Sequence, residues 1–375
     1  MYIRRIIATY AKMVEKIQRI YTSTIKGTFE EMFRNALSQA DTDAPIKLAI
    51  FGKTSDDSEY RQNLAIIDKV AEDIFGKQPP LTSYIAQKTA NDGVTIEATY
   101  ITDKDVTIEH HRNYRLINCN GCTELITGGI IPSNAEGSTF EQSMNIFEGI
   151  GKMLSTNGFK PSNIYRQWNY IPGITVMNDG SQNYQEFNDA RSIFYGSDSW
   201  TNGYPAATGI GTNAGGVVVE ICAIKGEKCT NKPIDNPLQI AAHNYSQQVL
   251  DGKVIEQLSK KTTPKFERAR LLGNTVLISG TAAIKGECSN YSTNAVEQAA
   301  ETMEIMDRLT SKDNIPAENN GSRYNLLRVY VKREQDIPAV KEYMQHNYPD
   351  AKKHYLVADV CRPELLIEIE GVAHI

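Results

Sequence analysis

The chain has 375 residues, and 41% of them are hydrophobic, which is enough for ordinary globular cores in two or three domains. Its formal net charge of −5 gives it no electrostatic surface for nucleic acid. No apolar run approaches the ~18–20 residues needed to span a membrane. We therefore expect a cytoplasmic protein without a nucleic-acid or membrane partner, as a monomer or a small homo-oligomer.

The first part of the chain gives weak signals. Residues 1–25 are basic and amphipathic, and they lack the continuous apolar core of a signal peptide. We interpret residues 1–40 as an amphipathic helical extension; a transit peptide is the alternative, although Glu15 counts against it. Residues 41–112 are expected to form an irregular N-terminal α/β region.

The six cysteines indicate no metal site. Cys119 and Cys122 have the spacing of half a zinc site, but no second pair follows at a suitable distance, and His110 and His111 do not complete one. Since no secretory signal is present, we expect six free thiols and no disulfide.

The remainder of the chain contains a duplication. The alternating apolar segment that contains Glu220 recurs around Glu368. Upstream of each glutamate, a strand-like stretch, a helix-capping pattern, a second strand and a second helix recur in the same order. Strands that alternate with amphipathic helices favour helices packed on a mixed sheet. The sequence therefore predicts an α/β (α+β) fold with two tandem modules, residues 113–230 and 231–375, each with helices on one face of a mixed sheet.

A glycine-rich segment follows the first module's second predicted helix. Gly209 and Gly211 lack the preceding strand and the following Lys-Ser/Thr of a phosphate loop. We expect a loop whose backbone N–H groups approach a bound carboxylate, with Arg191, Tyr195 and Thr208 as side-chain donors. The alternative is an ordinary turn beside a solvated Arg191.

The last predicted strand carries two carboxylates on one face, Glu368 and Glu370. Burial and mutual repulsion would raise the pKa of one of them, as a general acid near neutral pH requires. Pro363 favours an extended backbone at Arg362, whose side chain we expect to point toward substrate. The alternative is a strand on the outer side of its sheet, with both glutamates in solvent. No second ligand pocket is expected at Glu220.

Several short segments together resemble the chorismatases, a family within the YjgF/Rid-like superfamily. The resemblance spans roughly residues 45–375, and the individual segments are weak when taken alone. They are residues 79–87, 166–170, 187–191, 205–211 and 266–270, with the 126–129 turn and the terminal strand.

The resemblance implies a cofactor-free enzyme acting on chorismate, a dianion with an enolpyruvyl ether. Members of this family release pyruvate and leave a hydroxybenzoate or a dihydroxycyclohexadienoate. Glu368 matches the position of their essential acid. The candidate substrate-binding residues are then Arg166, Arg191, Tyr195, Tyr204, Thr208, Gly209, Gly211, Ala282 and Arg362.

Two residues bear on which product forms, and they favour different products. Cys361 matches the cysteine of the hydroxybenzoate-forming enzymes, seven residues before the acid, and is a second catalytic candidate. Ala282 looks more like the residue of the dienediol formers. We predict 3-hydroxybenzoate. The alternatives are a Rid-type enamine or imine deaminase, although those proteins are single-module trimers, and a non-catalytic binder of small carboxylic acids.

Overall fold

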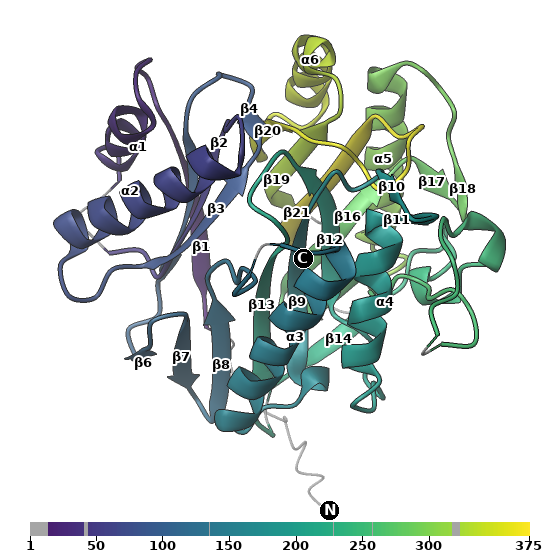
Figure 1. Ribbon diagram of the computed structural model, residues 1–375, viewed down its shortest axis with the longest axis horizontal. Coiled ribbons are helices and arrows are strands. Elements are labelled where there is room, and N and C mark those ends of the chain that lie inside the picture. Colours follow the sequence, from purple (N-terminus) through teal and green to yellow (C-terminus); the bar gives the residue numbers. More distant parts are fainter. Residues whose placement is uncertain (1–13, 41–43, 135, 228, 257, 317–322) are drawn as a thin grey trace, which may run out of the picture.

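The computed structural model describes residues 14–40, 44–134, 136–227, 229–256, 258–316 and 323–375. Apart from two-residue strands, these residues contain three units with one connectivity: strand, helix, strand, helix, strand, strand. In each unit the second and third strands are parallel, and the last strand lies between the first and second, antiparallel to both. Figure 1 shows the three pairs of helices on the outside of the strands.

The first unit was expected to be irregular, and that expectation is wrong. Its elements are β1 (Lys16–Thr22), α1 (Phe29–Leu37), β2 (Lys47–Gly52), α2 (Asp57–Phe75), β3 (Leu81–Ala86) and β5 (Thr95–Ile101). The helix expected within residues 1–40 is a strand at β1, which pairs with β5 along all its residues. Ile17 and Ile20 suit a helical spacing, but backbone hydrogen bonding to an open sheet edge overrides so weak a local preference. Residues 1–13 of the predicted helix lie outside the described residues.

The second unit supplies four consecutive strands of a six-stranded sheet. Its elements are β8 (Cys122–Thr127), α3 (Thr139–Thr156), β9 (Ile164–Pro172), α4 (Asn183–Tyr195), β12 (Ala206–Thr212) and β13 (Val218–Lys225), with β6 (Thr107–His110) and β7 (Tyr114–Cys119) added at one edge. The predicted capping box opens α3, since Ser138 accepts from Glu141 N–H and Glu141 binds back to the Ser138 backbone.

The third unit has the same order within a seven-stranded sheet. Its elements are β16 (Thr275–Ala282), α5 (Ala295–Leu309), β19 (Arg323–Val331), α6 (Ile337–Asn347), β20 (Lys352–Val357) and β21 (Ile367–His374), with β14 (Asn231–Ile234) and β15 (Ala269–Leu272) at one edge and β4 (Lys88–Thr89) at the other. Asn294 caps α5 by accepting from the N–H groups of Val296 and Glu297. The domain boundaries given above stay a prediction.

The three units share one interior. Each pair of helices packs on its own sheet to form a separate apolar core. A fourth core lies between the sheets and draws residues from all three units, among them Phe51, Tyr170 and Tyr330. None of the described helices combines the length and the apolar composition that crossing a membrane requires.

Three buried ion pairs connect the units in a ring. Each pair joins a cation on the second strand of one unit to a carboxylate on the last strand of another, and all six side chains are at most 8% exposed. The pairs are Lys47–Glu220, Arg166–Glu370 and Arg328–Glu97. Charges buried this deeply require their partners, so the ring fixes how the three sheets meet.

One expectation about the cysteines is wrong, because Cys122 and Cys229 form a disulfide. They are 107 residues apart in sequence, and the pairing of β13 with β8 brings them together. Sequence spacing held no sign of this proximity, since it depends on the sheet register.

The ion-pair ring predicts a specific pattern of unfolding energies. Lys47→Met should destabilise the protein by about 3–5 kcal/mol, because it leaves Glu220 buried without a counter-ion. Lys47→Met combined with Glu220→Met should recover most of that loss. Urea unfolding measures both, with Lys152→Met as the control, since the Lys152–Glu148 pair is solvent-exposed and worth about 0.2–1 kcal/mol. A double variant no more stable than Lys47→Met would contradict the account.

Candidate active site

One cavity lies between the second and third units. Its walls come from α4 and β12 of the second unit, from β16 and β21 of the third, and from the connecting residues 239–268. β12 and β16 approach each other there, which brings the two units' sheets together at the cavity floor. Glu368 lines this cavity.

Glu368 is a buried acid at the floor of the cavity. It stands on β21 opposite Ala282 of β16 and is only 4% exposed. The described residues give its carboxyl group no hydrogen bond. A Cβ atom at Gly280 would collide with that carboxyl, so a side chain there would displace the Glu368 carboxyl group from this position. Burial, and next the negative charge of Glu370, raise the pKa of Glu368 to about 8, although Arg166 opposes the shift.

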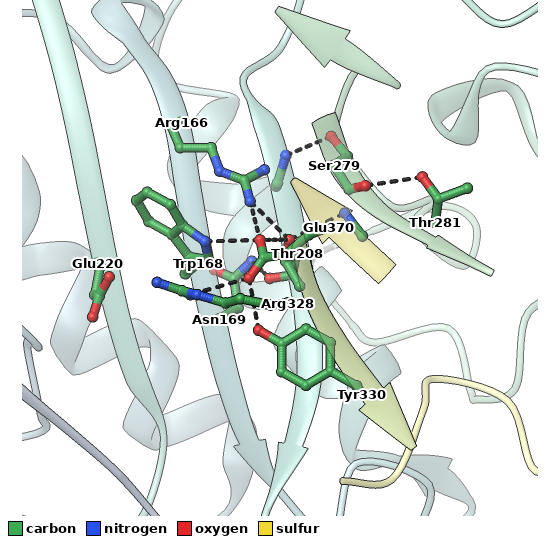
Figure 2. A network of polar contacts seen from close by, with 12 residues as sticks. Arg166, Trp168, Asn169, Thr208, Glu220, Ser279, Thr281, Arg328, Tyr330 and Glu370 are labelled. Carbon is green, nitrogen blue, oxygen red and sulfur yellow. Dashed lines mark hydrogen bonds and ion pairs between the residues drawn. The ribbon is translucent and has the colours of Figure 1, made fainter. Parts of the chain in front are cut away.

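Glu370, two residues further along β21, is held in the opposite state. Burial alone would raise its pKa, but Arg328 and Arg166 outweigh burial and lower it. Its Oε2 atom also accepts from Trp168 Nε1 at 2.8 Å and from Thr208 Oγ1 at 2.6 Å. Figure 2 shows these side chains converging on the Glu370 carboxylate. The strand therefore carries one glutamate that stays ionised and one that stays protonated near neutral pH.

The sheet register explains why Glu368 lacks an ionic partner. Each unit has a glutamate at the same place relative to the cation that it contributes to the ring of ion pairs. Glu97, Glu220 and Glu368 each lie opposite the residue that follows this cation by two positions. Glu97 and Glu220 form ring ion pairs, but in the third unit the pair is made by Glu370. At the position of Glu370 the other two units have Thr99 and Cys222. The extra glutamate takes the structural role and leaves Glu368 without one.

Three arginines surround the cavity, and none forms an ion pair within the described residues: Arg191, Arg268 and Arg362. Arg191 is 2% exposed and donates to Asn188 Oδ1 at 2.6 Å, while its Nε atom has no partner among the described groups. Arg268 donates to Tyr245 Oη at 2.8 Å, and its Nε is likewise unpartnered.

Arg362 is held by contacts outside its own strand-loop segment. Its Nη1 atom donates to the Glu287 carbonyl at 2.9 Å and to Ser289 Oγ at 2.8 Å. Its guanidinium lies 5.5 Å from the centre of the Tyr245 ring, and that of Arg268 lies 5.6 Å from it. Three guanidiniums without carboxylate partners make the cavity suitable for an anion with more than one negative group.

Comparison with known proteins identifies the family. Residues 99–223 match the family described as "Chorismatase FkbO/Hyg5-like, N-terminal". A 3-hydroxybenzoate synthase of Streptomyces hygroscopicus is 32% identical over 222 residues, which are 57% of this chain and 64% of that relative, so the match spans less than two thirds of its length. A chorismatase of Streptomyces rapamycinicus is 30% identical over 247 residues, 60% of this chain and 68% of the relative. This chain belongs to the chorismatase family.

A solved chorismatase structure has the same fold. It superposes with a TM-score of 0.71 over 96% of this chain and 98% of its own, at 20% sequence identity. The predicted α/β class with mixed sheets is thereby confirmed.

Six of the predicted site residues line the cavity together: Arg191, Gly209, Ala282, Cys361, Arg362 and Glu368. Cys361 lies close to the acid, and burial, followed by the charge of Glu368, raises the pKa of its thiol to about 12. This thiol therefore stays neutral at physiological pH.

The other predicted residues have different contacts. Arg166 and Thr208 bind the carboxylate of Glu370 instead of pointing into the cavity. Tyr195 donates to Gln167 Oε1 at 2.6 Å, and its ring stacks on Tyr204. Within the described residues, none of these four side chains lines the cavity.

The predicted glycine loop is wrong in form, because Gly209 and Gly211 lie within strand β12. The Gly211 N–H donates to the Asp359 carbonyl at 2.8 Å, so it is not available to a substrate carboxylate. A Cβ atom at Gly209 would meet the Tyr184 ring at 2.9 Å. The glycines therefore permit close packing of the strand against its neighbours.

Sequence reasoning missed several lining residues, notably Tyr184, Tyr245 and Arg268. Arg268 belongs to the 266–270 segment of the family resemblance, which could have identified it. Tyr245 stands in a long connection without periodic pattern, where no local signal marks it. Among the described residues, no cluster of three or more His, Cys, Asp or Glu side chains is arranged to hold a metal.

The raised pKa of Glu368 predicts a pH-dependent cost to stability. Between pH 4.5 and about 8 the unfolded chain loses this proton while the folded protein keeps it, so the folded state loses stability as the pH rises. Glu368→Gln removes this effect. As the pH rises across that range, the free energy of unfolding of the variant should increase relative to that of the wild type, by on the order of a few kcal/mol. Urea unfolding of both proteins at pH 5 and pH 8.5 measures this change. A difference in unfolding free energy between them that is the same at both pH values would contradict the prediction.

Proposed function

We propose that this protein cleaves the enolpyruvyl ether of chorismate to release pyruvate, with Glu368 as the general acid. The observation that supports this most strongly is the pKa of about 8 for a carboxyl group in a cavity lined by three guanidiniums that form no ion pair with any described residue. A carboxylic acid that keeps its proton at neutral pH can donate it to a weakly basic carbon.

The cavity's charge suits this substrate. Chorismate carries two carboxylates, one on the ring and one on the enolpyruvyl group. Arg191, Arg268 and Arg362 all line the cavity, so each of the two carboxylates can meet a guanidinium. Apolar lining from Ile284 and Phe266 suits the ring between them.

The chemistry needs one proton and no cofactor. Glu368 transfers its proton to the terminal CH₂ carbon of the enol ether, and the ether carbon becomes an oxocarbenium. If water adds to that carbon, the hemiketal collapses to pyruvate and a dihydroxycyclohexadienoate, and the water's proton restores Glu368. If the neighbouring ring hydroxyl adds to that carbon instead, it gives its proton to Glu368 and forms a cyclic ketal. The ring then loses the C–H proton of the carbon that bears the ether oxygen, and the bond between the ring and the former hydroxyl oxygen breaks. That oxygen becomes the carbonyl oxygen of pyruvate, while the ether oxygen stays on the aromatic ring and takes the proton, which gives 3-hydroxybenzoate without consumption of water. In either case the acid regains its proton within the cycle.

We infer 3-hydroxybenzoate as the product. Cys361 lies beside Glu368 with a neutral thiol, at the position expected for hydroxybenzoate formation. The relative from Streptomyces hygroscopicus named 3-hydroxybenzoate synthase supports the same choice. Ala282, directly opposite Glu368, remains the residue that favours the dienediol.

The test is direct. Purified protein incubated with chorismate should release pyruvate, measured by a coupled assay, and chromatography should show 3-hydroxybenzoate. Glu368→Gln should lower the rate by about 10²–10⁴-fold, since it keeps the shape but cannot donate the proton. Glu342→Gln, on an exposed position of α6, serves as the control and should retain full activity.

Two results would reject the proposal. Pyruvate release that survives in Glu368→Gln would remove Glu368 from the mechanism. No pyruvate from folded wild-type protein would favour an enamine or imine deaminase, or a binder of small carboxylic acids.

A further inference from the structure

Two irregular stretches close one side of the active-site cavity. We call residues 245–253 and 262–266 the strap. They contain no α-helix and no strand, and their cavity-facing side chains are mostly apolar. The apolar ones are Tyr245, Val249, Leu250, Pro264 and Phe266, and the charged Asp251 also lines the cavity.

A buried cluster of polar groups fastens the strap to α4. Thr262 Oγ1 donates to Asp189 Oδ1 at 2.6 Å. Gln185 Nε2 donates to the same oxygen at 2.9 Å and to the Thr262 carbonyl at 3.1 Å. All three residues are at most 8% exposed. Because a buried polar group is costly to leave unpaired, these bonds hold the strap down firmly.

The other end of the strap is bonded to β11 (Ser181–Gln182), directly before α4. The Asp251 carbonyl accepts from Gln182 N–H at 3.1 Å, and the Lys253 N–H donates to Ser181 Oγ at 3.0 Å. A Cβ atom at Gly252 would lie 2.5 Å from Gln185 Cγ. The strap therefore leaves no space for a side chain between itself and α4 at this point.

The two reaction outcomes differ in one respect that such a wall can control. Formation of the dihydroxycyclohexadienoate consumes one water molecule at the oxocarbenium carbon, and formation of hydroxybenzoate consumes none. A cavity closed by apolar side chains keeps bulk water from a reactive intermediate and suppresses its hydrolysis.

We propose that the strap, held by the Thr262–Asp189–Gln185 cluster, excludes water from the oxocarbenium and thereby determines the product. The inference rests on the proposed function and adds to it a specificity element outside the acid and the arginines. Thr262 and Gly252 are positioning residues in this account, since neither touches the reacting atoms.

The ratio of the two products tests the strap. Thr262→Val keeps the side-chain volume and removes the hydrogen bond to Asp189. Its dihydroxycyclohexadienoate fraction should rise at least about threefold, while total pyruvate release stays within about twofold of wild type. Gly252→Ala should change the ratio in the same direction by lifting the strap from Gln185. Thr302→Val is the matched control, because Thr302 is buried in α5 and donates to the Gln298 carbonyl at 2.7 Å, away from the strap.

The possible outcomes distinguish failure of the strap proposal from failure of the proposed function. Normal pyruvate release with an unchanged product ratio in both strap variants would overturn the strap's role and leave the proposed function intact. Wild-type protein that makes only the dihydroxycyclohexadienoate would also overturn it, because water then reaches the intermediate with the strap in place. No pyruvate from wild type would reject the function, and the strap proposal with it.

Discussion

The salt-bridged carboxylate of Glu370 is the interaction on which the rest of this structure depends. It is buried, and two guanidiniums from different units, Arg166 and Arg328, hold it ionised. In this position it performs two tasks. It closes the ring of ion pairs that joins the three units, and it places a permanent negative charge two residues from Glu368 on the same face of β21. That charge adds to burial in raising the pKa of Glu368.

The three units show how one of several similar elements can become a site. All three have a glutamate in equivalent register, but Glu97 and Glu220 are committed to ion pairs. Only the third unit has a second glutamate that makes the pair instead. The cavity forms where this unit meets α4 and β12 of the second unit. α4 supplies Arg191, and Gly209 of β12 allows the strand to pack closely against Tyr184. The first unit contributes to the acid only indirectly, through the bond of Glu97 to Arg328.

Many of the secondary-structure elements could be predicted from the sequence, because short local patterns encode them. The alternating strand around Glu368, the capping residues and the repeated order of elements identified two of the units and the strand that carries Glu368. The first unit was missed although Ile96-Glu97-Ala98 resembles Val219-Glu220-Ile221, because so short a likeness identifies a repeat only once the strands are paired. The disulfide, the ring of ion pairs and the partners of Arg166 join residues far apart in the chain. Arg166 looked like a substrate ligand because sequence does not reveal that Glu370 lies against it.

The central claim is that Glu368 is protonated at neutral pH because it is buried and because its neighbour Glu370 is ionised. Difference infrared spectroscopy of wild type against Glu368→Gln measures this directly, by the carbonyl band of a protonated carboxylic acid. We predict a band at pH 7 that is absent from Glu368→Gln and disappears with a midpoint near pH 8, shifting to lower pH in Glu370→Gln. A Glu368 that is already ionised at pH 7, or a midpoint unchanged in Glu370→Gln, would contradict the account.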